Sequence, residues 1–422
     1  MYCDICIIGA GASGLAAAVT AAEHCGADVV VLEGKQLPGR KIAASGNGRC
    51  NLTNVNAKGH QQVKEFFQHL GLFIRQEDEG RCYPLSGNSG DVVKALTRQA
   101  ESLAVKIHTN HSVESVEKKG DFLVKGTIRE KGKKNEKFTI RAGQLLIAAG
   151  GKSMAELGTS GDGVKFAKMM GHSVTRLVPV LTAVETVEKP EQQGYKGVRA
   201  KSRVYLEYRG DNIFSEQGEV QFTEDGISGI CVFNLSRHMM IPEGKNFRNG
   251  FDDYKVHIDL LPDMDMEEAE TSIKRAASSF VDRMERLGRE DFEIEDGVVE
   301  ILMSFVRKGI AEEIGRRIKN KLGKSKGYLY EVYDIACKSL EQIKDFNMQP
   351  IGARGWNFAQ VTRGGVSLDE INMETMESKL VSGLYFAGEV TDFDGPCGGY
   401  NLQNAWLTGI RCGRAMAERG RK

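Results

Sequence analysis

The chain has 422 residues, a length that suits two or three domains. It carries 57 Lys and Arg residues against 57 Asp and Glu residues, so its net charge is zero. No overall basic field exists to attract nucleic acid or an anionic membrane surface, and we expect neither as a partner. Glycine is unusually common, with 49 residues against 8 prolines. This composition favours a protein whose backbone turns tightly and approaches a small ligand closely.

The nine cysteines are scattered and odd in number, which argues against a disulfide framework. Cys3 and Cys6 lie in an apolar run that is typical of a buried strand, and no other Cys or His pair has metal-ligand spacing. We therefore expect no metal site. The N-terminus lacks the basic region of a signal peptide, and no stretch approaches the ~20 apolar residues of a membrane span. The sequence predicts a cytoplasmic protein.

The first thirty residues predict a strand, a glycine-rich turn, a helix and a second strand. The strands are expected at 3–8 and 28–32, and the helix from Ser13 to Cys25. The turn between them reads Gly9-Ala-Gly11-Ala-Ser-Gly14. In this context Gly9 permits the tight turn, Gly11 lets a pyrophosphate approach the backbone, and Gly14 lets helix and strand pack closely. The unit therefore predicts a parallel sheet with a dinucleotide site.

Glu33, at the end of the second strand, can accept hydrogen bonds from both ribose hydroxyls. Its charge would repel a 2′-phosphate, so the resident nucleotide is expected to be FAD or NAD rather than NADP. Val113, in the following strand pair, is expected to contact adenine through its backbone. The remaining contacts at this end of the nucleotide are expected from Gly9, Gly11, Ala12, Ser13, Gly14, Gly34 and Lys35.

In the rest of the chain the residue pattern changes twice, first to one typical of strands and then to one typical of helices. A polar loop over 35–59 is followed by helices near 61–70 and 89–103, and then by strands from 104 to 149 with a polar hairpin tip at 130–137. Residues 175–258 are typical of β-structure, and residues 265–345 are charged and helical. We expect a nucleotide-binding domain formed by 1–174 and 346–422. Into it are inserted a β-rich substrate domain, 175–258, and a helical cap, 259–345.

Two further elements favour FAD over NAD. A strand over 145–149 ends in small residues, Ala149, Gly150 and Gly151. A second strand begins at 383 and leads to Gly388 and Glu389, and a helix begins near Tyr400. Nucleotide-contacting elements at both ends of one domain suit an extended FAD. The partial positive charge of the helix N-terminus would stabilise an anionic reduced flavin by about 0.3–1 kcal/mol.

The stretch from Gly39 to Asn54, Gly-Arg-Lys-Ile-Ala-Ala-Ser-Gly-Asn-Gly-Arg-Cys-Asn-Leu-Thr-Asn, resembles the hallmark of a bacterial flavoprotein family. That family includes aminoacetone-oxidase-like enzymes and NAD(P)/FAD-dependent reductases of bile-acid pathways. The segments 362–367, 376–379 and 398–403 are similar to further motifs of the family, and the resemblance reaches the middle of the chain through 222–229.

The resemblance implies an α/β fold: a Rossmann-type, glutathione-reductase-like FAD-binding domain with an inserted β-rich domain and a helical cap. It also implies that FAD is bound non-covalently. Glu389 would contact the ribitol or phosphate side. Around the cofactor the resemblance places Arg40, Lys41, Ser45, Gly46, Asn47, Gly48, Arg49, Cys50 and Asn51, and at the flavin ring Gly399, Tyr400, Asn401, Leu402 and Gln403. The positive charges in this segment support the placement of FAD there, because Arg40, Lys41 and Arg49 can balance the negative charge of a pyrophosphate.

We expect an FAD-dependent oxidoreductase that transfers hydride at flavin N5, with NAD(P)H reducing a small enone-like substrate. Two alternatives remain: an oxidase of a small amine or amino ketone with oxygen as acceptor, and a flavin-bound sensor or binding protein. No second glycine-rich dinucleotide motif appears mid-chain, so NAD(P)H would have to visit the same flavin face as the substrate. The sequence identifies neither the catalytic residues nor the oligomeric state. Cys50 and Cys397 could face the flavin, either as inert packing residues or as a redox pair.

Overall fold

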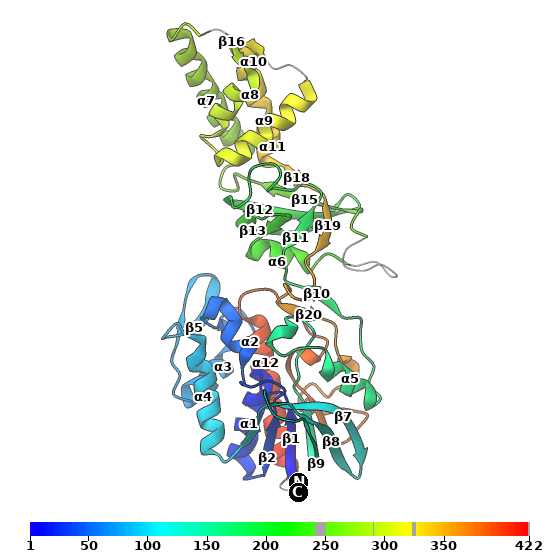
Figure 1. Ribbon diagram of the computed structural model, residues 1–422. Coiled ribbons are helices and arrows are strands. Elements are labelled where there is room, and N and C mark those ends of the chain that lie inside the picture. The colour runs from blue at the N-terminus through cyan, green and yellow to red at the C-terminus, as the bar shows by residue number, and fades with distance from the viewer. Residues whose placement is uncertain (241–249, 290, 323–325, 421–422) are drawn as a thin grey trace. The chain divides into compact units, whose positions relative to one another are not determined.

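The computed structural model describes residues 1–240, 250–289, 291–322 and 326–420. The chain divides into two compact units, and we describe each by itself. Unit 1 consists of Met1–Pro179 and Trp356–Lys422, and unit 2 is the continuous segment Val180–Gly355 (Figure 1). Strand β10 (Val178–Val180) lies at the first division.

Unit 1 is built on a mainly parallel sheet with the strand order β6-β2-β1-β9-β8-β7. Strand β1 (Tyr2–Ile8) runs parallel to β2 (Val29–Leu32) and to β9 (Glu136–Ile147). Strands β6 (Lys106–His108) and β21 (Leu384–Phe386) extend the parallel part. All four residues of β2 are buried, as expected for a parallel strand that is covered on both faces.

Strands β7 (His111–Lys119) and β8 (Asp121–Ile128) form an antiparallel ribbon with β9. The polar hairpin tip expected at 130–137 overlaps the β8–β9 connection, because β9 already begins at Glu136.

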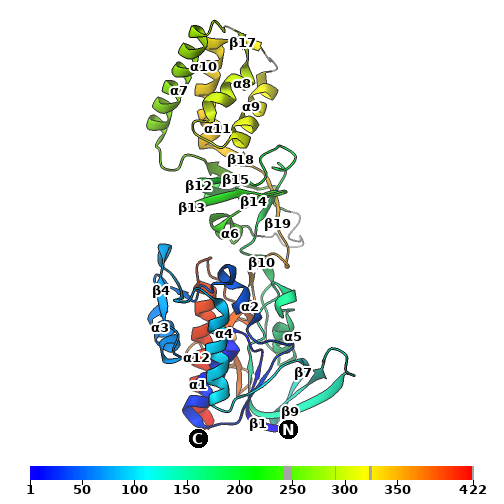
Figure 2. The ribbon, with the colours of Figure 1, turned by 60° about the vertical axis from the view of Figure 1, so that its left-hand side comes forward.

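Helix α1 (Ala12–Cys25) lies beside α12 (Tyr400–Gly420) and α4 (Ser89–Ser102) (Figures 1 and 2). Small residues make the first of these approaches possible. A Cβ atom added at Gly409 would lie 2.3 Å from the carbonyl oxygen of Ser13, and one added at Gly413 would lie 2.7 Å from that of Ala17. The last helix of the chain is therefore packed backbone to backbone against the first.

Shorter elements of unit 1 surround this core. The three-stranded antiparallel sheet β3-β5-β4 consists of Thr53–Asn54, Arg81–Pro84 and Ile74–Gln76. Helix α3 (His60–His69) precedes β4 and corresponds to the helix expected near 61–70. The expected loop over 35–59 contains short elements instead, α2 (Arg40–Ala44), η1 (Ser45–Gly48) and β3. The others are η2 (Asp78–Gly80), η3 (Ala155–Leu157), α5 (Asp162–Met169), β20 (Val361–Arg363), η4 (Leu368–Glu370) and η5 (Gly388–Val390).

Unit 2 contains an antiparallel sheet with the order β18-β15-β12-β13-β14-β11-β19. Its centre is the long pair β12 (Arg199–Tyr208) and β13 (Asp211–Phe222). The other strands are β11 (Val184–Thr186), β14 (Gly226–Ser228), β15 (Tyr254–Asp259), β18 (Phe346–Met348) and β19 (Pro350–Ala353). Its helices are α6 (Ile230–Ser236), α7 (Met266–Arg286), α8 (Ile294–Leu302), α9 (Lys308–Leu322), α10 (Leu329–Lys338) and α11 (Leu340–Lys344), with the small pair β16 (Asp291–Glu293) and β17 (Lys326–Tyr328).

The observed division differs from the expected one at both ends of the insertion. Residues 346–355 belong to unit 2 rather than to the nucleotide domain, because β18 pairs with β15 and β19 pairs with β11. Residues 175–179 belong to unit 1, where the Thr175 N–H donates to the Gly365 carbonyl at 2.9 Å. The β-rich and helical parts expected as separate domains share one hydrophobic core, which contains Val204 and Phe222 of the sheet together with Ile273 of α7.

None of the helices in the described part of the chain is both long enough and apolar enough to cross a membrane. Nor do the described residues contain a group of three or more His, Cys, Asp or Glu side chains that could hold a metal ion.

Candidate FAD-binding site

The three glycines between β1 and α1 occupy three different environments. A Cβ atom on Gly9, whose φ is +105°, would lie 2.5 Å from the Ala148 carbonyl oxygen, and one on Gly14 would lie 1.9 Å from that of Gly9. The protein itself therefore requires these two glycines. At Gly11 no protein atom lies within 4 Å of an added Cβ. Gly11 is also the N-cap of α1 and provides no side-chain cap. The open space at this helix N-terminus fits a pyrophosphate.

The Glu33 carboxylate is fixed beside this loop by backbone donors. Its Oε2 accepts the Ala10 N–H at 3.0 Å and its Oε1 accepts the Lys35 N–H at 2.9 Å. Burial raises the pKa of Glu33, while the two N–H donors and the nearby charges of Lys35 and Arg40 oppose that shift. Each carboxylate oxygen keeps a further lone pair that can accept a ribose hydroxyl.

The start of β7 lies next to the end of β2. The His111 N–H donates to the Glu33 carbonyl at 2.8 Å, and the Asn110 N–H donates to the Lys35 carbonyl at 2.9 Å. Val113 follows two residues later on β7 and packs against the hydrophobic core of unit 1. Val113, the residue expected to contact adenine, therefore lies on the strand that adjoins Glu33.

Segment 39–51 contains a series of left-handed backbone positions. Gly39, Gly46, Asn47, Gly48 and Cys50 have φ angles of 68°, 57°, 55°, 80° and 59°. Glycine tolerates this conformation, whereas a cysteine rarely adopts it. Residues 46–48 are exposed, so the turned backbone of this segment is available to a ligand.

Cys50 itself is buried, and burial raises the pKa of its thiol to about 12. Neither Cys50 nor Cys397 is part of a disulfide bond. A thiol with so high a pKa has almost no thiolate character near neutral pH, which favours packing over redox chemistry for Cys50.

The three cations expected to balance the pyrophosphate differ in their partners. Lys41 Nζ lies 2.6 Å from Glu389 Oε2. The Arg49 guanidinium lies 2.5 Å from Glu77 Oε1 and stacks over the Tyr83 ring at 4.2 Å. Among the described residues, no carboxylate forms an ion pair with Arg40. Arg40 is therefore the cation of the three whose charge is most available to a phosphate.

Glu389 connects several segments of unit 1. Its Oε1 accepts the Thr362 N–H at 2.9 Å, and the Thr362 hydroxyl oxygen accepts the N–H groups of Lys152 and Ser153 at 2.8 and 3.0 Å. A Cβ atom on Gly151 would lie 2.5 Å from that hydroxyl oxygen. Gly151 thus lies beside Glu389, and Ala149 and Gly150 precede it on the same segment.

The first turn of α12 is held in place by its own side chains. The Thr53 hydroxyl donates to Gln403 Oε1, and the Gln403 amide donates to the Lys58 carbonyl at 2.7 Å. Asn401 accepts the Gly395 N–H at 2.8 Å and donates to the Gly395 carbonyl at 2.9 Å. Since both amides already have partners, contacts of this helix with a flavin would come from backbone N–H groups and from Tyr400 and Leu402.

Close packing also restricts the neighbouring positions. A Cβ atom on Gly399, whose φ is +102°, would lie 2.7 Å from the carbonyl oxygen of Thr53 and 2.8 Å from Asn51 Oδ1. That Asn51 oxygen accepts the Cys82 N–H at 3.3 Å. Gly399 and Asn51 are thus brought together although 348 residues separate them in the sequence.

One polar arrangement escaped the sequence analysis. Nδ1 of the buried His172 lies 2.9 Å from Glu370 Oε2, and its Nε2 lies 2.8 Å from the Ser378 hydroxyl oxygen. This resembles a Ser–His–acid triad, but the Ser378 oxygen also accepts the N–H groups of Leu380 and Val381 at 3.0 and 2.8 Å. A hydroxyl held by two backbone donors and buried is suited to structural support rather than to nucleophilic attack.

This chain resembles one protein family and several known proteins over most of its length. The model of the HI0933-like protein Rossmann domain matches residues 3–65 and 55–415. The chain is 34% identical over 436 residues to a 3-dehydro-bile acid delta(4,6)-reductase of Clostridium scindens, covering 98% of both chains. It is 28% identical to a ribosomal RNA dihydrouridine synthase of Escherichia coli, again covering 98% of both.

Among solved structures, a 3-ketosteroid-delta4-(5alpha)-dehydrogenase from Rhodococcus jostii RHA1 matches with 15% identity and a TM-score of 0.45, covering 99% of this chain and 97% of that one. The family match spans nearly the whole chain, and the described residues fit an FAD at the glycine loop, at Glu33 and at the α12 N-terminus. The chain therefore belongs to the HI0933-like family, and it is an FAD-dependent oxidoreductase built on a Rossmann-type FAD-binding domain.

Proposed function

We propose that the enzyme uses NAD(P)H to reduce a carbon–carbon double bond conjugated to a carbonyl group in a small organic substrate. The observation that carries this proposal is the 34% identity, over 98% of both chains, to the Clostridium scindens reductase. By chemical nomenclature, that relative's name describes ring double bonds conjugated to a 3-keto group. Such an enone accepts hydride at the carbon remote from the carbonyl.

Ribosomal RNA is the second candidate substrate, favoured by the relatives in Escherichia coli and Haemophilus influenzae at 28% and 27% identity. Dihydrouridine arises from uridine by saturation of a double bond that is also conjugated to a carbonyl. Both kinds of relative therefore point to one reaction class, and they differ in the size of the substrate. The balanced charge of this chain and its higher identity to the bile-acid reductase favour the small substrate.

The residues of unit 1 have distinct parts in this proposal. Bound FAD would supply hydride transfer at its N5 position. The backbone at Gly11 and the N-terminus of α1 would hold the pyrophosphate, with Arg40 as the nearby cation, and Glu33 would accept the ribose hydroxyls. The Lys41–Glu389 ion pair would keep the turn before α12 in place, so that the N-terminus of α12 directs its positive end at the flavin.

An anaerobic titration of the purified holoenzyme with NADH and NADPH tests the electron donor. We expect one of them to bleach the flavin absorption band, and a 4-ene-3-one steroid to restore it in the absence of oxygen. A flavin that neither nucleotide bleaches would contradict the proposed donor and direct attention to amine oxidation.

The same reduced enzyme distinguishes the two substrates. Restoration of the band by unmodified ribosomal RNA, and by no small enone tested, would replace the small-substrate proposal with the RNA one. Restoration by oxygen alone, at the rate of free reduced flavin, would contradict both.

A further inference from the structure

Unit 2 contains a cavity that the FAD site does not use. Its volume is about 490 Å³, and it lies where the start of β12, the segment after β15 and the connection between α8 and α9 meet. The lining residues are Arg199, Ala200, Lys201, Leu260, Leu261, Pro262, Asp263, Met264, Met303, Ser304, Phe305, Val306 and Arg307. All of them belong to unit 2.

One wall of the cavity is held rigidly by a single lysine. Lys344 Nζ donates to Asp259 Oδ2 at 2.7 Å, and to the carbonyl oxygens of Leu261 and Met264 at 2.9 Å each. The Asp259 carboxylate in turn accepts the Leu261 N–H at 2.9 Å. The segment from Leu260 to Met264 is thus fixed in shape before any ligand arrives, which lowers the entropic cost of binding.

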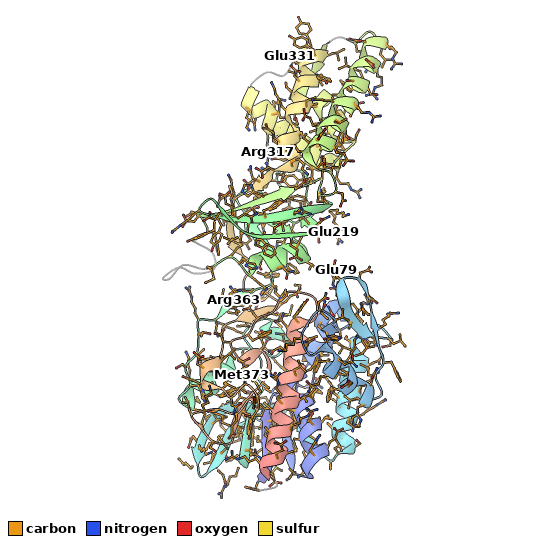
Figure 3. All side chains as sticks on the ribbon, turned by 180° about the vertical axis from the view of Figure 1, so that it is seen from behind. Glu79, Glu219, Arg317, Glu331, Arg363 and Met373 are labelled. Atoms are coloured by element: carbon orange, nitrogen blue, oxygen red, sulfur yellow. The ribbon has the colours of Figure 1, made fainter. Side chains whose placement is uncertain are left out.

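The lining of the cavity combines apolar side chains with polar surface that includes three basic groups and one carboxylate. Met303 is 48% exposed, Phe305 and Val306 are partly exposed, and Leu261 and Met264 also line the cavity. Lys201 lies 2.8 Å from Asp263, and Arg199 lies 3.0 Å from Glu219 on β13, which Figure 3 labels. For Arg307 the described residues provide no ion-pair partner. A lining of mixed polar and apolar character with one unpaired cation is complementary to a molecule that joins an apolar body to one negative charge.

We propose that this cavity binds an amphipathic organic monoanion, such as a carboxylate with a hydrocarbon body. Arg307 holds the anionic group, and the side chains of Met303, Phe305 and Val306 cover the hydrocarbon. RNA fits less well, because a phosphodiester chain is held by a row of unpaired cations, whereas this lining has one unpaired cation beside a few apolar side chains. The proposal does not depend on the reaction at the flavin.

Isothermal titration calorimetry with the holoenzyme tests the proposal, using decanoate below its micelle-forming concentration. We expect one decanoate to bind per chain. Butyrate, with six fewer methylenes, should bind at least about a hundredfold more weakly, because each buried methylene contributes about fourfold. Decyltrimethylammonium, with the same tail and the opposite charge, should not compete. If it competes as well as decanoate, or if butyrate binds equally well, the proposal is wrong.

A matched pair of variants tests the location. Arg307→Glu should weaken decanoate binding about tenfold. Lys308→Glu makes the same change in net charge at the next residue, which is exposed and does not line the cavity, and should change binding less than twofold in physiological salt. Equal losses in both variants, or none in Arg307→Glu, would overturn the site. Thermal unfolding of each variant verifies that it is folded. A short RNA that binds more tightly than decanoate and is displaced by it would show a polyanion site instead.

Discussion

Replacing Gly11 with valine should weaken FAD binding without greatly changing the stability of the apoprotein. Gly11 has φ −85° and ψ −165°, an extended conformation that valine adopts readily. An added Cβ meets no protein atom within 4 Å. The expected cost to the apoprotein is the loss of a tolerated N-cap residue, at most about 1 kcal/mol of unfolding free energy.

The same side chain would occupy the space assigned to the pyrophosphate. Displacing the phosphates from the N-terminus of α1 removes at least two charge-assisted hydrogen bonds, each worth about 1.5–3 kcal/mol. The affinity for FAD should therefore fall more than about a hundredfold. Gly9→Ala is the contrasting variant: its Cβ would lie 2.5 Å from the Ala148 carbonyl oxygen at a φ of +105°, so it should destabilise the apoprotein itself.

Two measurements check this reasoning. The flavin absorbance of the purified variants gives the FAD content per chain. Thermal unfolding with and without added FAD gives the stabilisation by binding, which is about 2.7 kcal/mol for the wild type at a hundred times its Kd. Gly11→Val should unfold like the wild-type apoprotein and gain nothing from FAD. A Gly11→Val protein that purifies with one flavin per chain would refute the placement of the phosphates.

Three other predictions follow from the geometry of unit 1. Lys41→Met leaves the Glu389 carboxylate without its cation and should weaken FAD binding about tenfold, and adding Glu389→Gln should recover part of the loss in a fluorescence titration. Burial lowers the pKa of His172 in the folded protein. As the pH falls through about 6.5, the histidine therefore becomes protonated in the unfolded chain before it does in the folded protein. The free energy of unfolding declines in this pH range as a result. His172→Gln should reduce that decline in pH-dependent denaturant unfolding; an unchanged slope would contradict the assignment. The Cys50 thiol, with a pKa of about 12, should resist iodoacetamide at pH 8 in the folded protein, while the partly exposed Cys397 reacts first in peptide mapping by mass spectrometry.

The glycine loop and its strands could be predicted from sequence because their determinants are local. The turn, the helix and the acidic residue at the end of β2 all lie within about thirty residues, and each follows from backbone geometry at Gly9, Gly14 and Glu33. The prediction of a Rossmann-type fold rested on the same local determinants, and it was confirmed.

Features that depend on distant residues could not be predicted in this way. Lys41 and Glu389 are 348 positions apart, and His172 and Ser378 are 206 apart, so no spacing rule joins them. Strands β18 and β19 have three and four residues, too few to show an alternation of apolar and polar side chains. Their membership of unit 2 depends on pairing with β15 and β11, which the local sequence does not reveal.

The close packing of α12 on α1 determines the order in which the two units can fold while the ribosome synthesises the chain. Unit 2 is continuous and is complete once residue 355 has been made. The glycine loop is synthesised before unit 2, but the adjoining helix α1 can pack fully only when α12 has been made. This is because Gly409 and Gly413 of α12 form the surface against which α1 packs. At about 5–20 residues per second, the roughly 240 residues after Pro179 take about 12–50 seconds to synthesise. Unit 1 can therefore complete its core only after the whole of unit 2 has been synthesised.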